Sequence, residues 1–199
     1  MILPTAFVPH VGYLSLIASS QVEGIYVGEI YQKQTLRNRM ELLTASGREH
    51  FTVPVCKIGY PSPLVSKVLI SEHGDWRRKL LYMLESSYKA TPYWSHYERR
   101  ILSLIFLHEP NLVLYNHRWL EMLCDAMGLK LPPLVHSEGE DFRPEVIDPS
   151  YFNKLFTSKR YWQVFESKYG FQPFLSSIDL LLNLGPEARL YFQNLKGVN

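Results

Sequence analysis

Cysteine is scarce in this sequence, and so is net charge. Cys56 and Cys124 are the two cysteines among 199 residues, and they lie far apart in no metal-ligand or redox spacing. That disfavours a disulfide framework and a structural zinc site. The formal net charge of +2 is too small for the broad basic surface that holds nucleic acid or an anionic membrane in physiological salt. We therefore expect no nucleic-acid or membrane partner, and a locally bound small anion as the ligand.

Long apolar runs are also missing. The first twenty residues, MILPTAFVPHVGYLSLIASS, lack a basic leader and are interrupted by Pro4 and Pro9. The stretch therefore fits neither a signal peptide nor a membrane span. Together with the scarce cysteines, this predicts a cytoplasmic protein.

Several catalytic motifs are absent as well. The sequence contains no GxSxG elbow, no P-loop, no GxGxxG fingerprint and no HExxH pair, which disfavours serine hydrolases, P-loop NTPases, dinucleotide enzymes and zincins. It also contains no DxD pair of the kind that metal-dependent glycosyltransferases use. We expect no metal site, and no motif indicates which cofactor, if any, is used.

The composition that is present is typical of a globular protein, with 46% hydrophobic and 20% charged residues. A chain of this length can bury a core without cross-links, so we expect one domain over residues 1–199. Apolar periodicity predicts a mixed α/β fold, in which a small sheet from the N-terminal half packs against a mainly helical C-terminal half.

The individual elements follow from the same patterns. Strands are expected at Ile2–Phe7, Ile25–Ile30, Met40–Leu43, His50–Val55 and Val65–Ile70, and the third and fourth are expected to form a hairpin. One helix is expected at Val11–Ser20, and three more in succession across residues 75–127. Asp75 is the expected cap at the start of these three helices and Gly128 the stop at their end.

The C-terminal third is predicted to contain a loop and two further helices. The segment Lys130–Ser150 is rich in proline, glycine and acidic residues and is predicted to be a long, mobile surface connection. Ser176 and Asp179 have the spacing of a capping box at a helix start, and Gly185-Pro186 is expected to end that helix and begin another.

The most unusual stretch is YQKQTLRNR, residues 31–39, which combines three cations with no acidic residue. If it is extended, Tyr31, Lys33, Arg37 and Arg39 share one side; if it is helical, Lys33 and Arg37 stack four residues apart. Either arrangement can converge on a phosphate or carboxylate, which suits a sugar-nucleotide pyrophosphate. The alternative is a solvated basic loop, or a structural segment whose cations neutralise buried acids.

Five successive motifs carry a family resemblance: AFVPHVGYLSLI, YQKQTLRNRMEL, FTVPV, WRRKLLYMLESSYKATPYW and LSSIDLLLNLGPEA. In this order they resemble the WbqC-like family of bacterial surface-polysaccharide gene clusters. The versions with YQKQ and ESSY followed by PYW are most similar to the branch found in Bacteroidetes. The resemblance spans nearly the whole chain.

The resemblance implies a role beside lipopolysaccharide O-antigen and capsule genes, with glycine or acyl transfer onto sugars as the suggested chemistry. The family's polar signature falls on Tyr31, Lys33, Arg37, Asn38, Arg39, Glu85, Tyr88, Asp179 and Asn183. This sequence departs from many relatives in two places, with Thr5 where they carry glutamine and Leu80 where they often carry histidine. Leucine cannot act as a general base, so this member can bind without catalysing.

Two residues are candidates for moving a proton. Glu85 lies three residues before Tyr88 on an expected helix, near one face, although a surface glutamate beside a core tyrosine explains the pattern equally well. His10 lies in the turn after the first strand, where α/β sheets tend to bind ligands, although an exposed turn histidine is the simpler explanation. Cys124 adjoins an apolar helix stripe and is expected to be inert.

These observations leave two functional hypotheses. The first is a cytoplasmic transferase that places an acyl or aminoacyl group on a nucleotide-activated sugar, with residues 31–39 holding the anion and Glu85 or His10 moving a proton. The alternative is a noncatalytic accessory protein that binds a sugar nucleotide or a glycan-assembly enzyme through the same segment, and Leu80 favours it. Neither hypothesis defines an oligomeric state.

Overall fold

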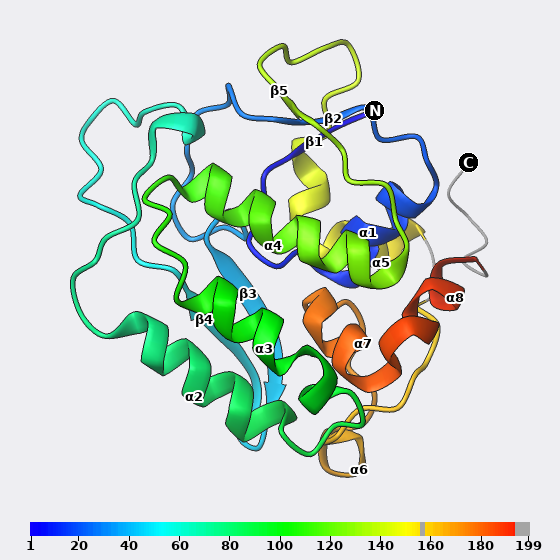
Figure 1. The fold of residues 1–199 in the computed structure, drawn as a ribbon. Coiled ribbons are helices and arrows are strands. Elements are labelled where there is room, and N and C mark those ends of the chain that lie inside the picture. Colours follow the sequence, from blue (N-terminus) through cyan, green and yellow to red (C-terminus); the bar gives the residue numbers. More distant parts are fainter. Residues whose placement is uncertain (156–157, 194–199) are drawn as a thin grey trace.

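The computed structural model describes residues 1–155 and 158–193, and a small parallel sheet lies near the amino terminus (Figure 1). Its strands are β1 (Ile2–Pro4), β2 (Gly24–Tyr26) and β5 (Leu134–Val135), in that order. Leu3 pairs with Ile25, which pairs in turn with Leu134. Parallel neighbours need crossover connections. Helix α1 (Val11–Ala18) makes the first crossover, and most of the hairpin and helical region makes the second.

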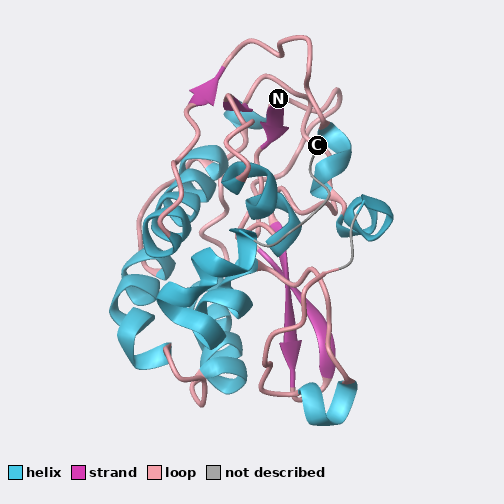
Figure 2. Cartoon of the chain, turned by 90° about the vertical axis from the view of Figure 1, so that its right-hand side faces the viewer, coloured by secondary structure: helices cyan, strands magenta, loops and turns pink. Residues whose placement is uncertain are grey.

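The second sheet is the predicted antiparallel hairpin, formed by β3 (Arg39–Thr44) and β4 (Gly47–Thr52). Glu41 lies opposite His50 in its register. The short helix α6 (Glu166–Tyr169) closes the tip, because the side chains of Lys168 and Tyr169 both donate hydrogen bonds to the carbonyl of Ala45. Figure 2 shows the hairpin with α6 at its far end and the longer helices on one side.

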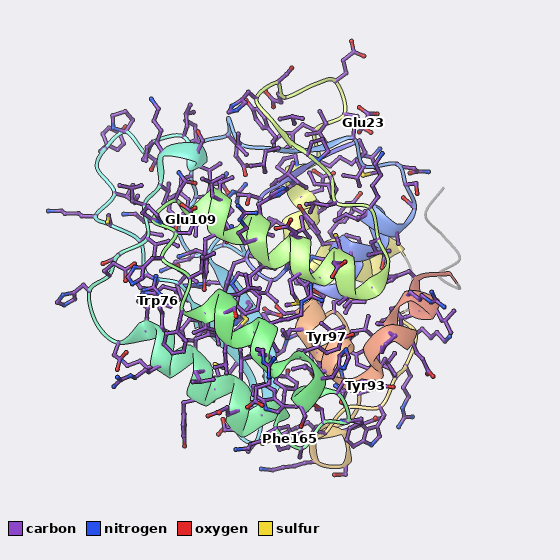
Figure 3. The ribbon with its side chains drawn as sticks, in the orientation of Figure 1. Glu23, Trp76, Tyr93, Tyr97, Glu109 and Phe165 are labelled. Carbon is purple, nitrogen blue, oxygen red and sulfur yellow. The ribbon has the colours of Figure 1, made fainter. Side chains whose placement is uncertain are left out.

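The three helices predicted across residues 75–127 are present as α2 (Trp76–Tyr88), α3 (Trp94–Ile105) and α4 (Leu112–Met127). The Asn111 side chain caps α4 by accepting two backbone N–H groups, and Gly128 ends it with a φ of +64°. Their apolar stripes face each other. Trp76, labelled at the start of α2 in Figure 3, has its ring centroid 5.9 Å from that of Tyr115 on α4.

The carboxy-terminal helices are α5 (Pro149–Leu155), α7 (Ser177–Leu184) and α8 (Ala188–Gln193). The predicted break after α7 is confirmed, because Gly185 there has a φ of +55° and begins a short 3-10 turn. A Cβ on Gly185 would lie 2.4 Å from the ring of Tyr93. Tyr93 and Tyr97 mark this junction of α3 with α7 in Figure 3.

Buried apolar side chains from both sheets and from α1 to α4, α7 and α8 form one contiguous cluster. The predicted mixed α/β class, with a small sheet against a mainly helical C-terminal half, is confirmed (Figure 1). Among the described residues, no helix combines the length and the apolar character needed to cross a bilayer.

The strand expected at Val65–Ile70 is wrong. Val65–Lys67 forms a 3-10 turn, in which the Val68 N–H donates to the Val65 carbonyl, and Ile70 makes a single bridge with Val55. The Ile70 N–H instead donates to the carbonyl of Pro110. Local turns and loop contacts therefore take the backbone groups that a strand would have used.

Three further predictions differ from the structure. Residues 130–150 were predicted to be a long surface connection, but they contain β5 and are hydrogen-bonded to the parallel sheet. The Ile25 N–H donates to the Pro133 carbonyl, and the Arg143 N–H donates to the Ile2 carbonyl. The capping box at Ser176 is absent, because its hydroxyl accepts the backbone N–H of Glu41 instead. Asp75 begins α2 without a side-chain capping bond.

Candidate functional site

Residues 31–38 form a series of turns between β2 and β3, so neither the extended nor the helical alternative describes them. Backbone hydrogen bonds hold the segment at several points. The Tyr31 N–H donates to Pro63, the Phe7 N–H donates to Leu36, and the Val53 N–H donates to Asn38. This segment therefore has a defined path, and its side chains have defined neighbours.

The segment forms one wall of a cavity of about 420 Å³, which we call the cationic cavity. Its lining residues are Tyr31, Lys33, Gln34, Asn38 and Arg39 from this segment, and Thr52, Val53, Pro54, Val55, Cys56, Lys57 and Ile58 from the end of β4 and the chain beyond it. Small-molecule sites span roughly 300–1,000 Å³, so this volume suits a small ligand. Four of the five signature residues between Tyr31 and Arg39 are brought together here.

The charge of the cationic cavity is of one sign. Lys33, Arg39 and Lys57 line it, and none of its described lining residues is a carboxylate. Among the described residues, the Arg39 side chain has no ion-pair partner, and its buried Nε has no hydrogen-bond partner. Burial raises the pKa of the Tyr31 hydroxyl, while Arg37 and Arg39 lower it. A ligand with one or two negative charges would supply the missing counterion.

Asn38 contributes a polar group that the fold does not use fully. Its side chain is 4% exposed, and its Nδ2 donates a hydrogen bond of 2.9 Å to the Val53 carbonyl. Its Oδ1 has no hydrogen-bond partner among the described residues. Buried polar atoms are normally paired, so this oxygen is an unsatisfied acceptor in a residue that lines the cavity.

Arg37 has a different role from its neighbours. Its side chain is 1% exposed and forms a bidentate ion pair with Glu29, in which Arg37 Nε donates to Glu29 Oε1 at 2.9 Å. Its backbone carbonyl accepts from Asn116, which also donates to the hydroxyl of Thr5. Arg37 is not among the lining residues of the cationic cavity, and its charge is neutralised inside the fold.

A second cavity of about 240 Å³, which we call the small cavity, adjoins the first. Its lining residues are Gln34, Thr35, Leu36, Arg39, Glu41, His50, Ile147, Asp148 and Pro149. Gln34 and Arg39 therefore line both cavities. Sequence reasoning missed Lys57, Glu41, His50 and Asp148. The predicted hairpin strands, Met40–Leu43 and His50–Val55, would place Leu43 opposite His50, whereas the structure pairs Glu41 with His50.

Tyr88, Asp179 and Asn183 lie elsewhere, in a buried polar cluster. Tyr88 comes from α2, and Asp179 and Asn183 come from α7. Asp179 accepts hydrogen bonds from Tyr161 at 2.6 Å and Gln163 at 3.2 Å, and Asn183 donates to the Asp179 carbonyl. Burial raises the pKa of Asp179 to about 6, and the bonds from Tyr161, Tyr88 and Gln163 act in the opposite direction. None of the three signature residues lines either cavity.

The two proton-transfer candidates are likewise outside both cavities. His10 is buried and caps α1, because its Nδ1 accepts the Tyr13 N–H while its Nε2 bonds the Val146 carbonyl at 3.0 Å. Burial lowers its pKa to about 4, and the Val146 carbonyl partly offsets that shift. Glu85 is partly exposed on α2.

Leu80 and Cys124, which also stood out in the sequence, belong to the core. Leu80 is fully buried on α2. Burial raises the pKa of the Cys124 thiol to about 12, so this thiol stays protonated at neutral pH. Neither residue lines either cavity.

Fold and site together define a mixed α/β protein with a cation-lined cavity between a turn-rich segment and a β-hairpin. The family model described as the WbqC-like protein family matches residues 5–143, a span that includes every residue of the cationic cavity. The chain therefore belongs to the WbqC-like family. The match ends before the motif LSSIDLLLNLGPEA.

One relative among curated proteins is similar over almost its full length. It is the uncharacterised protein Rv1507c of Mycobacterium tuberculosis, which is 28% identical over 224 residues, covering 96% of this chain and 96% of that protein. No solved structure matches the chain significantly.

Proposed function

We propose that the cationic cavity binds a small ligand bearing phosphate or carboxylate, and that the protein uses it in acyl or aminoacyl transfer to a nucleotide-activated sugar during cytoplasmic surface-polysaccharide biosynthesis. The observation that carries the binding step is Arg39, a cavity-lining guanidinium without a counterion in the described chain. Guanidinium and ammonium groups together suit the oxygens of a phosphate or pyrophosphate.

The transfer step is proposed from the charge of the cavity and not from an acid–base residue. Family membership is compatible with it, and a bound anion beside Arg39, Lys33 and Lys57 would have its charge stabilised in a confined site. The proposed acid–base residues Glu85 and His10 do not contribute to the cavity. We therefore give them no role in the chemistry proposed for it.

A noncatalytic accessory protein that binds the same sugar nucleotide is the second candidate. Leu80 favours it, because this core residue occupies the position at which many relatives carry a titratable histidine. Under this alternative the cavity keeps the same ligand and the protein presents it to another enzyme.

Thermal unfolding with inorganic phosphate, UDP-glucose and acetyl-coenzyme A tests the binding step. A ligand at about 100 times its Kd stabilises the native state by about 2.7 kcal/mol, which raises the Tm by roughly 5–10 °C in a chain of this size. Arg39→Gln should abolish the shift. Arg78→Gln, at a side chain 78% exposed on α2, is the matched control and should retain it.

An unchanged Tm with every phosphate-bearing compound would refute an anion site in the cationic cavity. Mass spectrometry of the protein incubated with acetyl-coenzyme A and UDP-glucose then separates the two candidates. An acylated sugar nucleotide supports the transferase, and binding without product supports the accessory protein.

A further inference from the structure

We propose that the two cavities are the halves of one site for a phosphorylated sugar, with the phosphate in the cationic cavity and the ring hydroxyls in the small cavity on Glu41, His50 and Asp148. This inference rests on the anion site proposed above and specifies the ligand and how it lies. The shared walls Arg39 and Gln34 connect the halves.

The volumes favour one ligand over two. At about 240 Å³ the small cavity is below the range of about 300–1,000 Å³ in which small-molecule sites fall. As an extension of the neighbouring cavity of about 420 Å³, it can hold one ring of a longer ligand. Arg39 lines both spaces, so this residue lies where the phosphate and the ring of one molecule would meet.

The chemistry of the two halves is complementary to the two ends of such a ligand. The cationic cavity offers positive charge and hydrogen-bond donors, which suit phosphate oxygens. The small cavity adds two carboxylates and an imidazole, which accept hydrogen bonds from hydroxyl groups. Phosphate is repelled by carboxylates at close range, so it is directed to the cationic half and the hydroxyls to the other.

The acceptors of the small cavity are already oriented. Glu41 Oε2 accepts from Arg48 Nε at 3.0 Å, and Glu41 Oε1 lies 3.4 Å from His50 Nδ1. This arrangement leaves His50 Nε2 for a ligand. Asp148 Oδ1 accepts the backbone N–H of Ser150 at 2.9 Å, which fixes that carboxylate and leaves Oδ2 without a hydrogen bond to a described residue.

The experiment is isothermal titration of the full chain with inorganic phosphate, α-glucose 1-phosphate, N-acetylglucosamine 1-phosphate and free glucose. At least one sugar phosphate should bind tenfold or more tightly than phosphate, and free glucose should bind more weakly than either. The double substitution His50→Gln and Asp148→Asn should weaken that sugar phosphate about tenfold and change the Kd for phosphate by less than twofold.

Two variants complete the test. Arg39→Gln should weaken phosphate and sugar phosphate alike, and Glu49→Gln should change neither, because Glu49 is an exposed residue of β4 that lines no part of the two cavities. Equal affinity for phosphate and both sugar phosphates in the unaltered protein would overturn the composite site and leave the anion site standing. No binding of any phosphate would overturn both.

Discussion

Arg37 and Arg39 are two residues apart in the chain, and of the two only Arg37 has a carboxylate partner among the described residues. Arg37 is buried against Glu29, whereas Arg39 borders two cavities. A single basic motif therefore divides into a structural cation and a cation available to a ligand.

Glu29→Gln should destabilise the protein by about 3–5 kcal/mol, because it leaves the buried guanidinium of Arg37 without its counterion. Urea denaturation measures the change in the free energy of unfolding. The matched substitution Glu23→Gln removes an exposed partner of the amino terminus and should cost less than about 1 kcal/mol. Equal stability of the two variants would show that the ion pair of Arg37 contributes little.

The buried carboxyl of Asp179 should make the protein less stable as the pH rises from about 4 to about 6. Its pKa is about 6 in the fold against an ordinary value of 3.8, so the folded state binds the proton more tightly and loses that advantage on ionisation. Two pKa units correspond to about 3 kcal/mol. Asp179→Asn should remove this slope from the pH dependence of unfolding, whereas Asp75→Asn at the surface should preserve it.

His10 should change the pH dependence of stability in the opposite direction, making the protein more stable as the pH rises from about 4 to 6.5. Its pKa is about 4 in the fold against an ordinary 6.5, so the folded state excludes the proton, and stability present above pH 6.5 is lost as the pH falls toward 4. The change amounts to about 3 kcal/mol. His10→Asn retains a residue that favours helix caps, and it should reduce the loss of stability between about pH 6.5 and 4. His73→Asn, at an exposed histidine, should leave it as steep as before.

Gly185→Ala should cost more than Gly128→Ala, although both glycines have positive φ. At Gly128 (φ +64°, ψ +34°) an alanine carries the penalty of about 1–2 kcal/mol for the left-handed helical region. Gly185 (φ +55°, ψ −134°) lies outside that region, in a conformation that glycine alone adopts readily, so the backbone penalty there is at least as large. At Gly185 the new Cβ also meets the Tyr93 ring, which adds about 1–3 kcal/mol of overpacking. At Gly128 no atom of the described chain, beyond the adjoining residues and its own helix, lies within 4 Å of the new Cβ. Chemical denaturation of the two variants measures the difference, and similar losses would mean that Tyr93 moves aside at little cost.

Local patterns were enough to predict much of this fold. The hairpin, the three central helices and the stops at Gly128 and Gly185 all follow from apolar spacing and glycine chemistry. The pairing of β5 with β2 was not predictable, because a two-residue strand has no periodicity. Val65–Ile70 has the composition of a strand, but its backbone partners come from distant loops.

The site was only partly predictable for a related reason. The absence of acidic residues from residues 31–39 distinguished this segment in the sequence, and Lys33, Asn38 and Arg39 line one cavity in the structure. Composition could not show that Glu29, eight residues before Arg37, forms a buried ion pair with it. Nor could spacing along one chain place Asp148 beside His50, since only the tertiary fold brings them to one cavity.

The parallel sheet bears on how the chain folds. The register of β2 with β5 joins Ile25 to Leu134, so this pairing must wait until more than a hundred intervening residues have been made, whereas β3 and β4 pair across a tight turn. During synthesis the hairpin and α2 to α4 can form first, and the amino-terminal strands gain their last neighbour late. In refolding followed by pulsed hydrogen exchange, amides of β3 and β4 should be protected before those of β2.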